Sequence, residues 1–285
     1  KNLSFTKASQ ELFVSQPAIT KHIQELEAAY QTRLFDRQGS RISLTESGNL
    51  LLEHCERILE DYKRLEYEMH LLHNEYTGGL KLRASTTIAQ YVLPPLLASF
   101  IGKFPQVSLS LLNGNSREIE AALQEHRIDL GFVEGVFRLP NIRYTTFLED
   151  ELVAVVRTGS KLAVGEEITP DELFHLPLVL RERGSGTLDV FERALQQHNI
   201  KLSSLQVLMY LGSTESIKLF LEHTDCLGIV SVRSITRELY SGQLRVVEIK
   251  GMPMLRDFSF AQPQGQESGL AQVFMQFAMH NNHKL

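Results

Sequence analysis

The sequence predicts a mixed fold: an N-terminal winged helix-turn-helix, one long linker helix and a C-terminal two-lobed α/β domain. Three observations predict it. Residues 4–48 contain two short helical segments joined by a tight turn and followed by a hairpin pattern. An apolar repeat with an average step of 3.5 residues then runs from Leu51 to Tyr76. Beyond Leu80, β-type runs alternate with helical runs, an order that indicates a parallel sheet with right-handed crossovers.

The first two helices are predicted from spacing and from a cap. Over residues 6–13, Ala8, Leu12 and Phe13 have the spacing of one helix face, and residues 14–15 break the pattern. Ser15 is a good N-cap for the next helix because its hydroxyl can accept a bond from a free N–H of the first turn. Pro17 falls in that first turn, where a missing N–H has no cost.

The second helix has one apolar and one polar face. Its apolar stripe is Ala18, Ile19, Ile23 and Leu26, and its other face carries Gln16, Thr20, Lys21 and Gln24. Such a helix can enter the major groove of DNA, where glutamine and lysine side chains can pair with base edges. His22 on the same helix could contact phosphate or a base, or could contact neither.

A wing is predicted directly after this helix. Residues 33–37 and 41–44 alternate as strands do, with a turn at 38–40, which places Arg37 and Arg41 near the tip. We expect Ser15 and Arg37 to hold phosphates, which sets register, while the helix face reads bases. The predicted DNA-binding set is Ser15, Gln16, Pro17, Thr20, Lys21, His22, Arg37 and Arg41.

The order SFTKAS, VSQPAITKHIQELE, RLFDR, LTESG closely resembles the DNA-binding domain of LysR-type transcriptional regulators. The resemblance covers about 45 residues without gaps, and the rest of the chain matches by layout. It implies a double-stranded DNA operator, a small-molecule effector, and an effector domain similar to periplasmic binding proteins. The family has one more helix before this motif, whereas the chain starts at Lys1. We therefore expect that first helix to be missing here.

Composition limits the class of protein. The chain of 285 residues has 43% hydrophobic and 22% charged residues, which predicts a globular protein of two or three domains. With neither an 18-residue apolar run nor a secretory signal, we expect a cytoplasmic protein without a membrane partner. Cys55 and Cys226 are far apart and predict no metal site, and we expect no cofactor. Residues 1–44 carry a net charge of +2 and the rest of the chain −7, so dimerisation would be needed to collect enough phosphate contacts.

The linker helix carries the pattern of a coiled-coil seam. Thr45 can cap it, and the seam residues are Leu51, Cys55, Ile58, Tyr62, Leu65, Met69, Leu72 and Tyr76. Steps that alternate between four and three residues favour pairing with a second subunit over packing on the helix's own domain. In the resembling family this helix is the dimerisation element and the pairing is antiparallel. We expect a homodimer or homotetramer.

The remaining chain alternates strands and helices. We expect strands at residues 80–84, 107–112, 129–134, 151–157, 178–181, 207–211, 228–230, 244–249 and 257–261, and helices at 90–104, 117–127, 188–198, 215–223, 235–240 and 270–281. The predicted domains are 1–44 (DNA binding), 45–78 (linker and dimerisation) and 79–285 (effector binding). Lobe I is expected at 80–156 plus 258–285, and lobe II at 157–257.

An effector site is predicted where hydroxyl-rich loops follow strands and open helices. In parallel sheets ligands bind beyond the carboxyl ends of the strands, and a helix N-terminus favours an anion. A carboxylate, a sulfur oxyanion or a phosphorylated metabolite would suit such loops, unless the hydroxyls are only helix caps. Arg181 and Arg183 flank one loop, and Glu134, if it faced inward, would oppose a highly charged anion. The predicted site is Ser85, Thr86, Thr87, Phe132, Gly184, Ser185, Gly186, Thr187, Ser213 and Thr214.

Two other classes of function compete with a ligand-responsive transcription factor. One is a small-anion sensor module that does not bind DNA, and the other is an α/β enzyme that uses the same loops. The ordered helix-turn-helix and wing argue against both. The loop GSGT has no lysine after it, as a Walker motif would need, and no nucleophile elbow or two-histidine motif is present, so we predict no catalytic residues.

Overall fold

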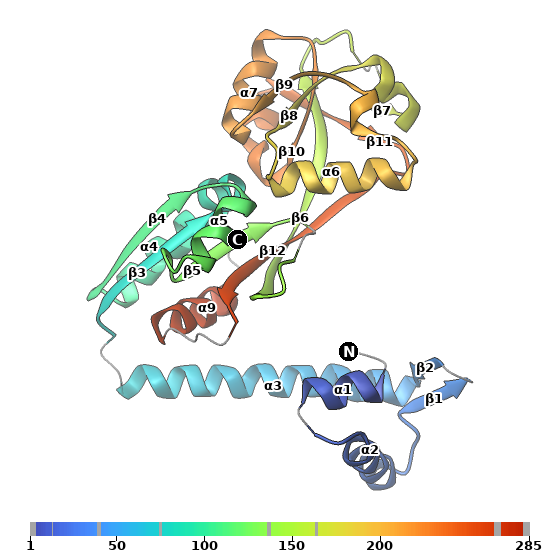
Figure 1. The fold of residues 1–285 in the computed structure, drawn as a ribbon, viewed down its shortest axis with the longest axis vertical. Coiled ribbons are helices and arrows are strands. Elements are labelled where there is room, and N and C mark those ends of the chain that lie inside the picture. The colour runs from blue at the N-terminus through green and yellow to red at the C-terminus, as the bar shows by residue number, and fades with distance from the viewer. Residues whose placement is uncertain are drawn as a thin grey trace. The chain divides into compact units, whose positions relative to one another are not determined.

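The computed structural model describes residues 4–12, 14–38, 41–73, 76–135, 138–162, 165–264 and 269–281. The chain divides into two compact units, Lys1–Asn74 and Glu75–Leu285 (Figure 1). Each unit is described by itself below. In the described part of the chain, no helix is both long enough and apolar enough to cross a bilayer.

The first unit contains α1 (Phe5–Glu11), α2 (Gln16–Tyr30), β1 (Phe35–Gln38), β2 (Arg41–Leu44) and α3 (Glu46–His73). Ser15 caps α2 by accepting a hydrogen bond from the amide of Ala18, and a proline stands in the first turn, as the sequence predicts. β1 and β2 pair antiparallel, with Phe35 opposite Leu44. The predicted helix-turn-helix and the strands of the wing are thus present, while Phe13, Gly39 and Ser40 lie outside the described residues.

Two polar side chains form hydrogen bonds that connect α2 and α3 to the residues just before β1. The Glu27 carboxylate accepts a hydrogen bond from the amide of Leu34 at 2.8 Å. The Thr45 hydroxyl donates to the carbonyl of Arg33 at 2.6 Å and accepts from the amide of Gly48 at 3.0 Å, which caps α3 as predicted. Apolar residues of this unit line an open groove of about 510 Å³, among them Phe5, Ile19, Ile23, Leu34 and Leu51.

α3 exposes much of its predicted seam. Ile58 is 66% exposed, and Cys55, Tyr62, Leu65 and Met69 are exposed as well. Exposure of large apolar side chains to water is unfavourable. Their position along one seam of the helix therefore indicates that they are buried against a second subunit.

The described strands of the second unit form one ten-stranded mixed sheet. They are β3 (Gly78–Ala84), β4 (Val107–Asn113), β5 (Leu130–Glu134), β6 (Ile142–Arg157), β7 (Glu167–Ile168), β8 (Pro177–Arg181), β9 (Gln206–Leu211), β10 (Leu227–Ser231), β11 (Leu244–Ile249) and β12 (Met254–Pro263). The order along the main path is β4-β3-β5-β12-β6-β10-β8-β9. β3 pairs parallel with β4 and β5, and β8 pairs parallel with β9 and β10.

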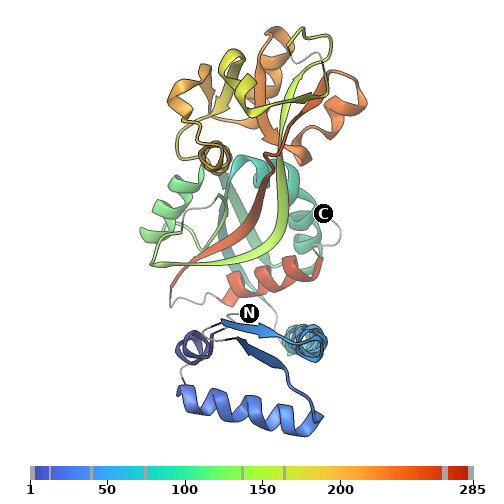
Figure 2. The same ribbon diagram turned by 90° about the vertical axis from the view of Figure 1, so that its right-hand side faces the viewer.

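The sheet has two parts joined by β6 and β12. We name lobe I the part built on β3, β4 and β5, and lobe II the part built on β8, β9 and β10. β6 pairs antiparallel with β12 over its first eleven positions and with β10 near its end, so both long strands belong to both lobes. In Figure 2 the two strands run side by side from one lobe into the other. The predicted residue limits of the lobes stay a prediction.

Helices complete both lobes. They are η1 (Ile88–Val92), α4 (Leu93–Lys103), α5 (Ser116–Gln124) and α9 (Gly269–Asn281) in lobe I, and η2 (Pro170–His175), α6 (Gly186–Gln197), η3 (Leu202–Ser204), α7 (Thr214–His223), η4 (Val232–Ser234) and α8 (Thr236–Tyr240) in lobe II. α9 returns to lobe I, where the ring of Phe274 packs at a tilt against Phe100 of α4 and edge-to-face against Phe132 of β5. In lobe II the core includes Val179, Ile217 and Cys226.

Cys226 gives a direct test of this core. The side chain is fully buried, and desolvation together with the nearby Asp225 charge raises its pKa to about 11. Because the thiolate is the reactive form, we expect iodoacetamide at pH 8 to leave Cys226 unmodified in folded Cys55→Ser protein and to modify it in urea. Mass spectrometry counts the adducts. An adduct on the folded variant would contradict the buried position.

Candidate functional site

One exposed surface of α2 carries most of the predicted DNA-binding residues. Gln16, Pro17, Lys21 and His22 are exposed, and Thr20 is half-buried. The Thr20 hydroxyl donates to the carbonyl of Gln16 at 3.1 Å. Within the helix, the ammonium of Lys21 lies 3.8 Å from the Glu25 carboxylate and the His22 imidazole lies 3.4 Å from it. Exposed pairs of this kind contribute little to stability, so both side chains can exchange Glu25 for a phosphate. The side chains of Arg37 and Arg41 lie outside the described part of the structure.

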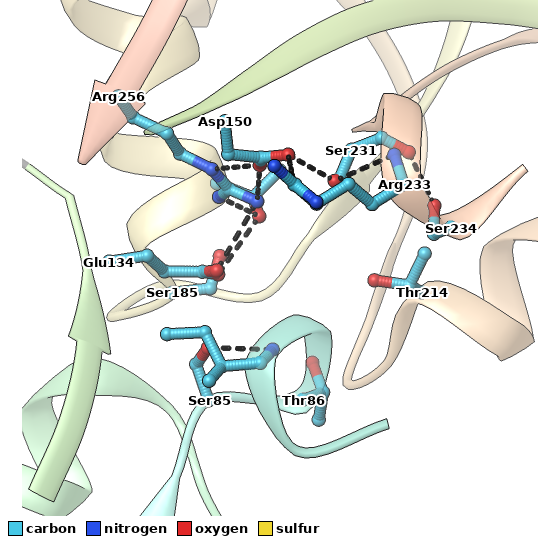
Figure 3. Close-up of polar contacts among 12 residues, drawn as sticks. Ser85, Thr86, Glu134, Asp150, Ser185, Thr214, Ser231, Arg233, Ser234 and Arg256 are labelled. Atoms are coloured by element: carbon cyan, nitrogen blue, oxygen red, sulfur yellow. Dashed lines mark hydrogen bonds and ion pairs between the residues drawn. The ribbon is translucent and has the colours of Figure 1, made fainter. Parts of the chain in front are cut away.

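The second unit brings three hydroxyl-rich loops together, one from lobe I and two from lobe II. Ser85 and Thr86 follow β3, Ser185 caps α6, and Ser213 caps α7. Figure 3 shows Ser85, Thr86, Ser185 and Thr214 around a common space. The first turns of α6 and α7 have free amides directed to their N-terminal ends, so both favour an anion there.

Arg181, the last residue of β8, connects these loops. Its guanidinium is only 2% exposed, and its Nη1 donates to the hydroxyl of Thr86 at 2.7 Å and to that of Thr214 at 3.5 Å. Glu182 accepts from the other side of the guanidinium at 2.8 and 3.1 Å. A buried cation with one carboxylate partner therefore stands between hydroxyls of both lobes.

A second buried charge network lies beside the loops. Arg256 of β12 is 5% exposed and donates from Nε to Asp150 of β6 at 2.7 Å and from Nη1 to the hydroxyl of Thr187 at 2.9 Å. Its Nη2 is 2.7 Å from Asp150 and 3.2 Å from Glu134, without hydrogen-bond geometry to either, so the attraction there is Coulombic. Ser231 also donates to Asp150, at 2.7 Å (Figure 3).

Glu134 joins lobe I to the first turn of α6. Its carboxylate accepts from the Thr187 hydroxyl at 3.2 Å, and its carbonyl accepts from the Ser116 hydroxyl at 2.8 Å. The backbone of Gly186 lies so close that a Cβ there would be 2.1 Å from the Glu134 carbonyl oxygen. Glu134 thus faces Arg256 and Thr187. The positive charge of Arg256 offsets the repulsion that Glu134 was expected to exert on a bound anion.

Several of the predicted effector-binding residues are buried in the core, shape the backbone or cap helices. Phe132 is fully buried against the rings of Phe147, Phe260 and Phe274, so it belongs to the lobe I core and we leave it out of the site. Thr87 is fully buried, and its hydroxyl has no hydrogen-bond partner among the described residues. Gly184 has a φ of +93°, which favours glycine, and lies next to Arg117. Ser185 and Ser213 both cap helices, which is the alternative role that the sequence left open for these hydroxyls.

Sequence reasoning named Glu134 and Thr187 but missed the other members of the second network. Asp150, Ser231, Arg233 and Arg256 come from strands or turns that carry no motif, and they meet only because β6, β10 and β12 are neighbours. Arg181, by contrast, was named from the sequence as a charged residue that flanks the glycine-containing loop at 184–187.

The comparison with protein families decides the class of this protein. Residues 1–49 match the model described as bacterial regulatory helix-turn-helix protein, lysR family, and residues 73–282 match the LysR substrate binding domain. The chain belongs to the LysR family. The family resemblance seen in the sequence is therefore confirmed. The match at residues 1–49 favours a DNA-binding LysR regulator over a sensor module without DNA binding.

The sequence similarity to individual LysR regulators covers most of the chain. The chain is 35% identical to HTH-type transcriptional regulator YeiE of Escherichia coli (strain K12), over 87% of this chain and 82% of that protein. It is 30% identical to the HTH-type transcriptional activator CmpR of Synechocystis sp., over 96% of this chain and 89% of that one. This protein is a DNA-binding transcriptional regulator with an effector-binding domain, as the sequence predicts.

Solved LysR structures share the fold. The CcmR regulatory domain of Synechocystis PCC6803, in complex with 2-PG, matches with a TM-score of 0.65 and 28% identity, over 72% of this chain and 97% of that one. Full-length CbnR complexed with its target DNA matches with a TM-score of 0.58 and 21% identity, over 98% of this chain and 94% of that one. The likeness to CbnR shows the fold of the whole chain, including the N-terminal helix-turn-helix and α3.

Proposed function

We propose that the effector of this LysR regulator is a small anion held between the two lobes by Ser85, Thr86, Ser185 and Thr214. The observation that carries the proposal is the buried guanidinium of Arg181, which bonds hydroxyls of both lobes. A buried cation needs compensating acceptors, and an oxyanion can replace the hydroxyl oxygens that now accept from Nη1. The relative CcmR, solved with 2-PG, supports an anion of this class. We further propose that the effector is bound and not converted.

The charges of the proposed site limit the ligand. Arg181 is already paired with Glu182, and Arg256 with Asp150 and Glu134. The anion would therefore be held mainly by hydroxyls and by the first turns of α6 and α7, with little net positive charge around it. Such a site favours a compact anion with several acceptor oxygens over one with many charges.

The test of this proposal is a thermal-shift screen of the full chain with sulfate, phosphate, simple carboxylates and sugar phosphates. An anion at 100 times its dissociation constant should add about 2.7 kcal/mol to the free energy of unfolding. If none of these anions raises the unfolding temperature, the effector is not a small anion of this kind.

Thr86→Val tests the geometry of the site. The substitution keeps the branched shape and removes a hydroxyl that would donate to the bound anion. We therefore expect the affinity for the anion found in the screen to fall by roughly tenfold, the effect of about one hydrogen bond to a charged group. Isothermal titration measures the loss. Thr146→Val, at an exposed strand position, is the matched control and should bind as the parent does. Equal affinity of Thr86→Val and the parent would place the anion elsewhere.

We propose that α2 enters the major groove, with Gln16, Thr20 and Lys21 near base edges and Ser15 at a phosphate. The exposed, positively charged side chain of Lys21 on α2 suits this role, and the LysR helix-turn-helix match at residues 1–49 supports it. We place the protein in the cytoplasm, where bacterial operator DNA is. Pairing through the exposed stripe on α3 would present two such helices to one operator.

Lys21→Ala tests the DNA contact. We expect it to weaken operator binding by about tenfold or more, since a base contact is worth roughly 1–3 kcal/mol. Gel-shift titration on the operator measures the change, and circular dichroism checks folding. Lys201→Ala, an exposed lysine of lobe II, is the control. An unchanged operator affinity in Lys21→Ala would remove Lys21 from the interface.

We propose that the effector acts by changing the angle between the lobes. A ligand shifts a two-state equilibrium only through its different affinity for the two states, so the contacts between lobes set the size of the response. The new angle would alter how paired subunits pack and thereby the spacing of the two α2 helices on DNA.

A further inference from the structure

Besides the strands β6 and β12 and the contacts of Arg181 and Glu134, one more hydrogen bond joins the lobes. The hydroxyl of Tyr91, in the π-helical segment η1 of lobe I, donates to the carboxylate of Glu215 in the first turn of α7 in lobe II. The two residues are 124 positions apart in the chain. π-Helical turns are rare and are frequently found at functional sites, so the segment that carries Tyr91 is unusual in itself.

Lys218 fixes the carboxylate that Tyr91 reaches. The lysine is 4% exposed, and its ammonium lies 2.7 Å from Glu215 and 2.8 Å from Glu238, and donates to the carbonyl of Ser234 at 2.9 Å. It also stands 5.3 Å from the centre of the Tyr91 ring, within range of a cation–π contact. Glu215 is therefore held in place on lobe II before Tyr91 binds it.

The ionisation states agree with this arrangement. Burial alone would raise the pKa of Glu215, but hydrogen bonds with Lys218 and Tyr91 lower it. Burial would lower the pKa of Lys218, and hydrogen bonds with Glu215 and Glu238 raise it. Burial and the bond to Glu215 raise the pKa of Tyr91. At neutral pH the phenol is thus a donor and Glu215 a charged acceptor, which is the stronger kind of hydrogen bond.

The position of this contact relates it to the loops of the proposed effector site. Tyr91 follows the loop of Ser85 and Thr86 by less than two helical turns, and Glu215 directly follows Thr214. β3 and β9, which lead into these loops, stand toward opposite ends of the sheet order, whereas β6 and β12 stand in its middle. The Tyr91 contact therefore ties the lobes together on a different side of the loops from the strands that join them.

We propose that Tyr91, Glu215 and Lys218 form an inter-lobe latch that holds the lobes together before the effector binds. Given the proposed effector site, the anion reaches and leaves the loops when the latch opens. The latch sets the closed fraction of the free protein, and an effector that completes the closure gains from lobes already held near their bound positions. Loss of the latch shifts the free protein toward open lobes.

The experiment measures the distance between the lobes in the full chain without any effector. Spin labels are placed at two exposed positions, Gln124→Cys in lobe I and Gln197→Cys in lobe II, in a Cys55→Ser, Cys226→Ala background. Labelled subunits are diluted with unlabelled ones so that each measured distance lies within one subunit. Pulsed electron resonance gives the populations of short and long distances.

Tyr91→Phe removes only the hydroxyl, and we expect it to raise the ratio of long to short distances by about tenfold, as for a typical hydrogen bond to a charged group. Tyr240→Phe, at a tyrosine that is 91% exposed, is the matched control and should leave the distances unchanged. Glu215→Gln should open the lobes as well, and adding it to Tyr91→Phe should have little further effect, because both remove one contact.

Distances in Tyr91→Phe that equal those of the parent would overturn the latch. An opening in Tyr240→Phe as large as that in Tyr91→Phe would overturn it too, because the effect would not be specific to the contact. The anion screen is a separate measurement. Lobes that open in Tyr91→Phe, together with a parent that binds none of the anions, would support the latch and contradict the proposed effector.

Discussion

Arg256→Met is expected to lower the free energy of unfolding by about 3–5 kcal/mol, the usual cost of removing one partner from a buried ion pair. The side chain is buried between Asp150 and Glu134, and both carboxylates are buried too. Methionine fills much of the space but leaves two negative charges in a place from which water is excluded. Urea denaturation of the full chain, followed by circular dichroism, measures the loss.

Two controls separate charge from packing. Lys250→Met removes one partner of an exposed pair with Glu167 and should cost less than about 1 kcal/mol. Adding Asp150→Asn to Arg256→Met removes one of the uncompensated charges and should restore part of the stability. If Arg256→Met costs no more than Lys250→Met, the network is not the buried ionic contact that its distances indicate.

Gly186→Ala is expected to destabilise the second unit by about 1–3 kcal/mol or more, as overpacking of a close contact does. The added Cβ would lie 2.1 Å from the carbonyl oxygen and 2.4 Å from the carbonyl carbon of Glu134. Both are backbone atoms, so no side-chain rotation relieves the overlap. The first turn of α6 must move away from the end of β5, and we expect the two lobes to separate there.

Denaturation midpoints measure this effect against a matched substitution. Gly102→Ala, within α4, adds a Cβ that meets nothing within 4 Å, so it should keep the stability or raise it by up to about 1 kcal/mol. If the two alanine variants have the same midpoint, then Gly186 and Glu134 are not in backbone contact in solution.

The sequence predicted the elements whose signals are local. Ser15 and Thr45 predict the starts of α2 and α3, because an N-cap depends only on a few neighbouring residues. The helix α9 and the strand β11 are also close to their predicted ranges, because each carries a clear apolar pattern.

Elements with mixed faces were predicted only in part. β6 begins at Ile142, although only residues 151–157 were predicted. Its first half does not keep a strict alternation, since the exposed residues Arg143 and Thr146 are three positions apart. The π-helical turn before Leu93 was not predicted either, since π and α segments share the same residue preferences.

The candidate site shows the same limit. The hydroxyl loops were found from the chain because each adjoins a strand end and a helix start. The partners Arg256 and Asp150 lie 106 positions apart and were not found, because their meeting depends on which strands are neighbours in the sheet. The sequence likewise could not show that Phe132 packs against Phe260 and Phe274 in the core, because those residues come from other elements.

The continuous pairing of β6 with β12 determines how the lobes can move. The ladder runs from Leu152 opposite Met254 to Ile142 opposite Pro263, with one register shift between Phe258 and Ser259. Rotation of one lobe against the other is then torsion of a two-stranded ribbon, and the irregular position is where a bend concentrates most easily. Twisting such a ribbon transfers no ladder hydrogen bond to water. The regulator can therefore change shape elastically and return, without local unfolding, each time its ligand binds and leaves.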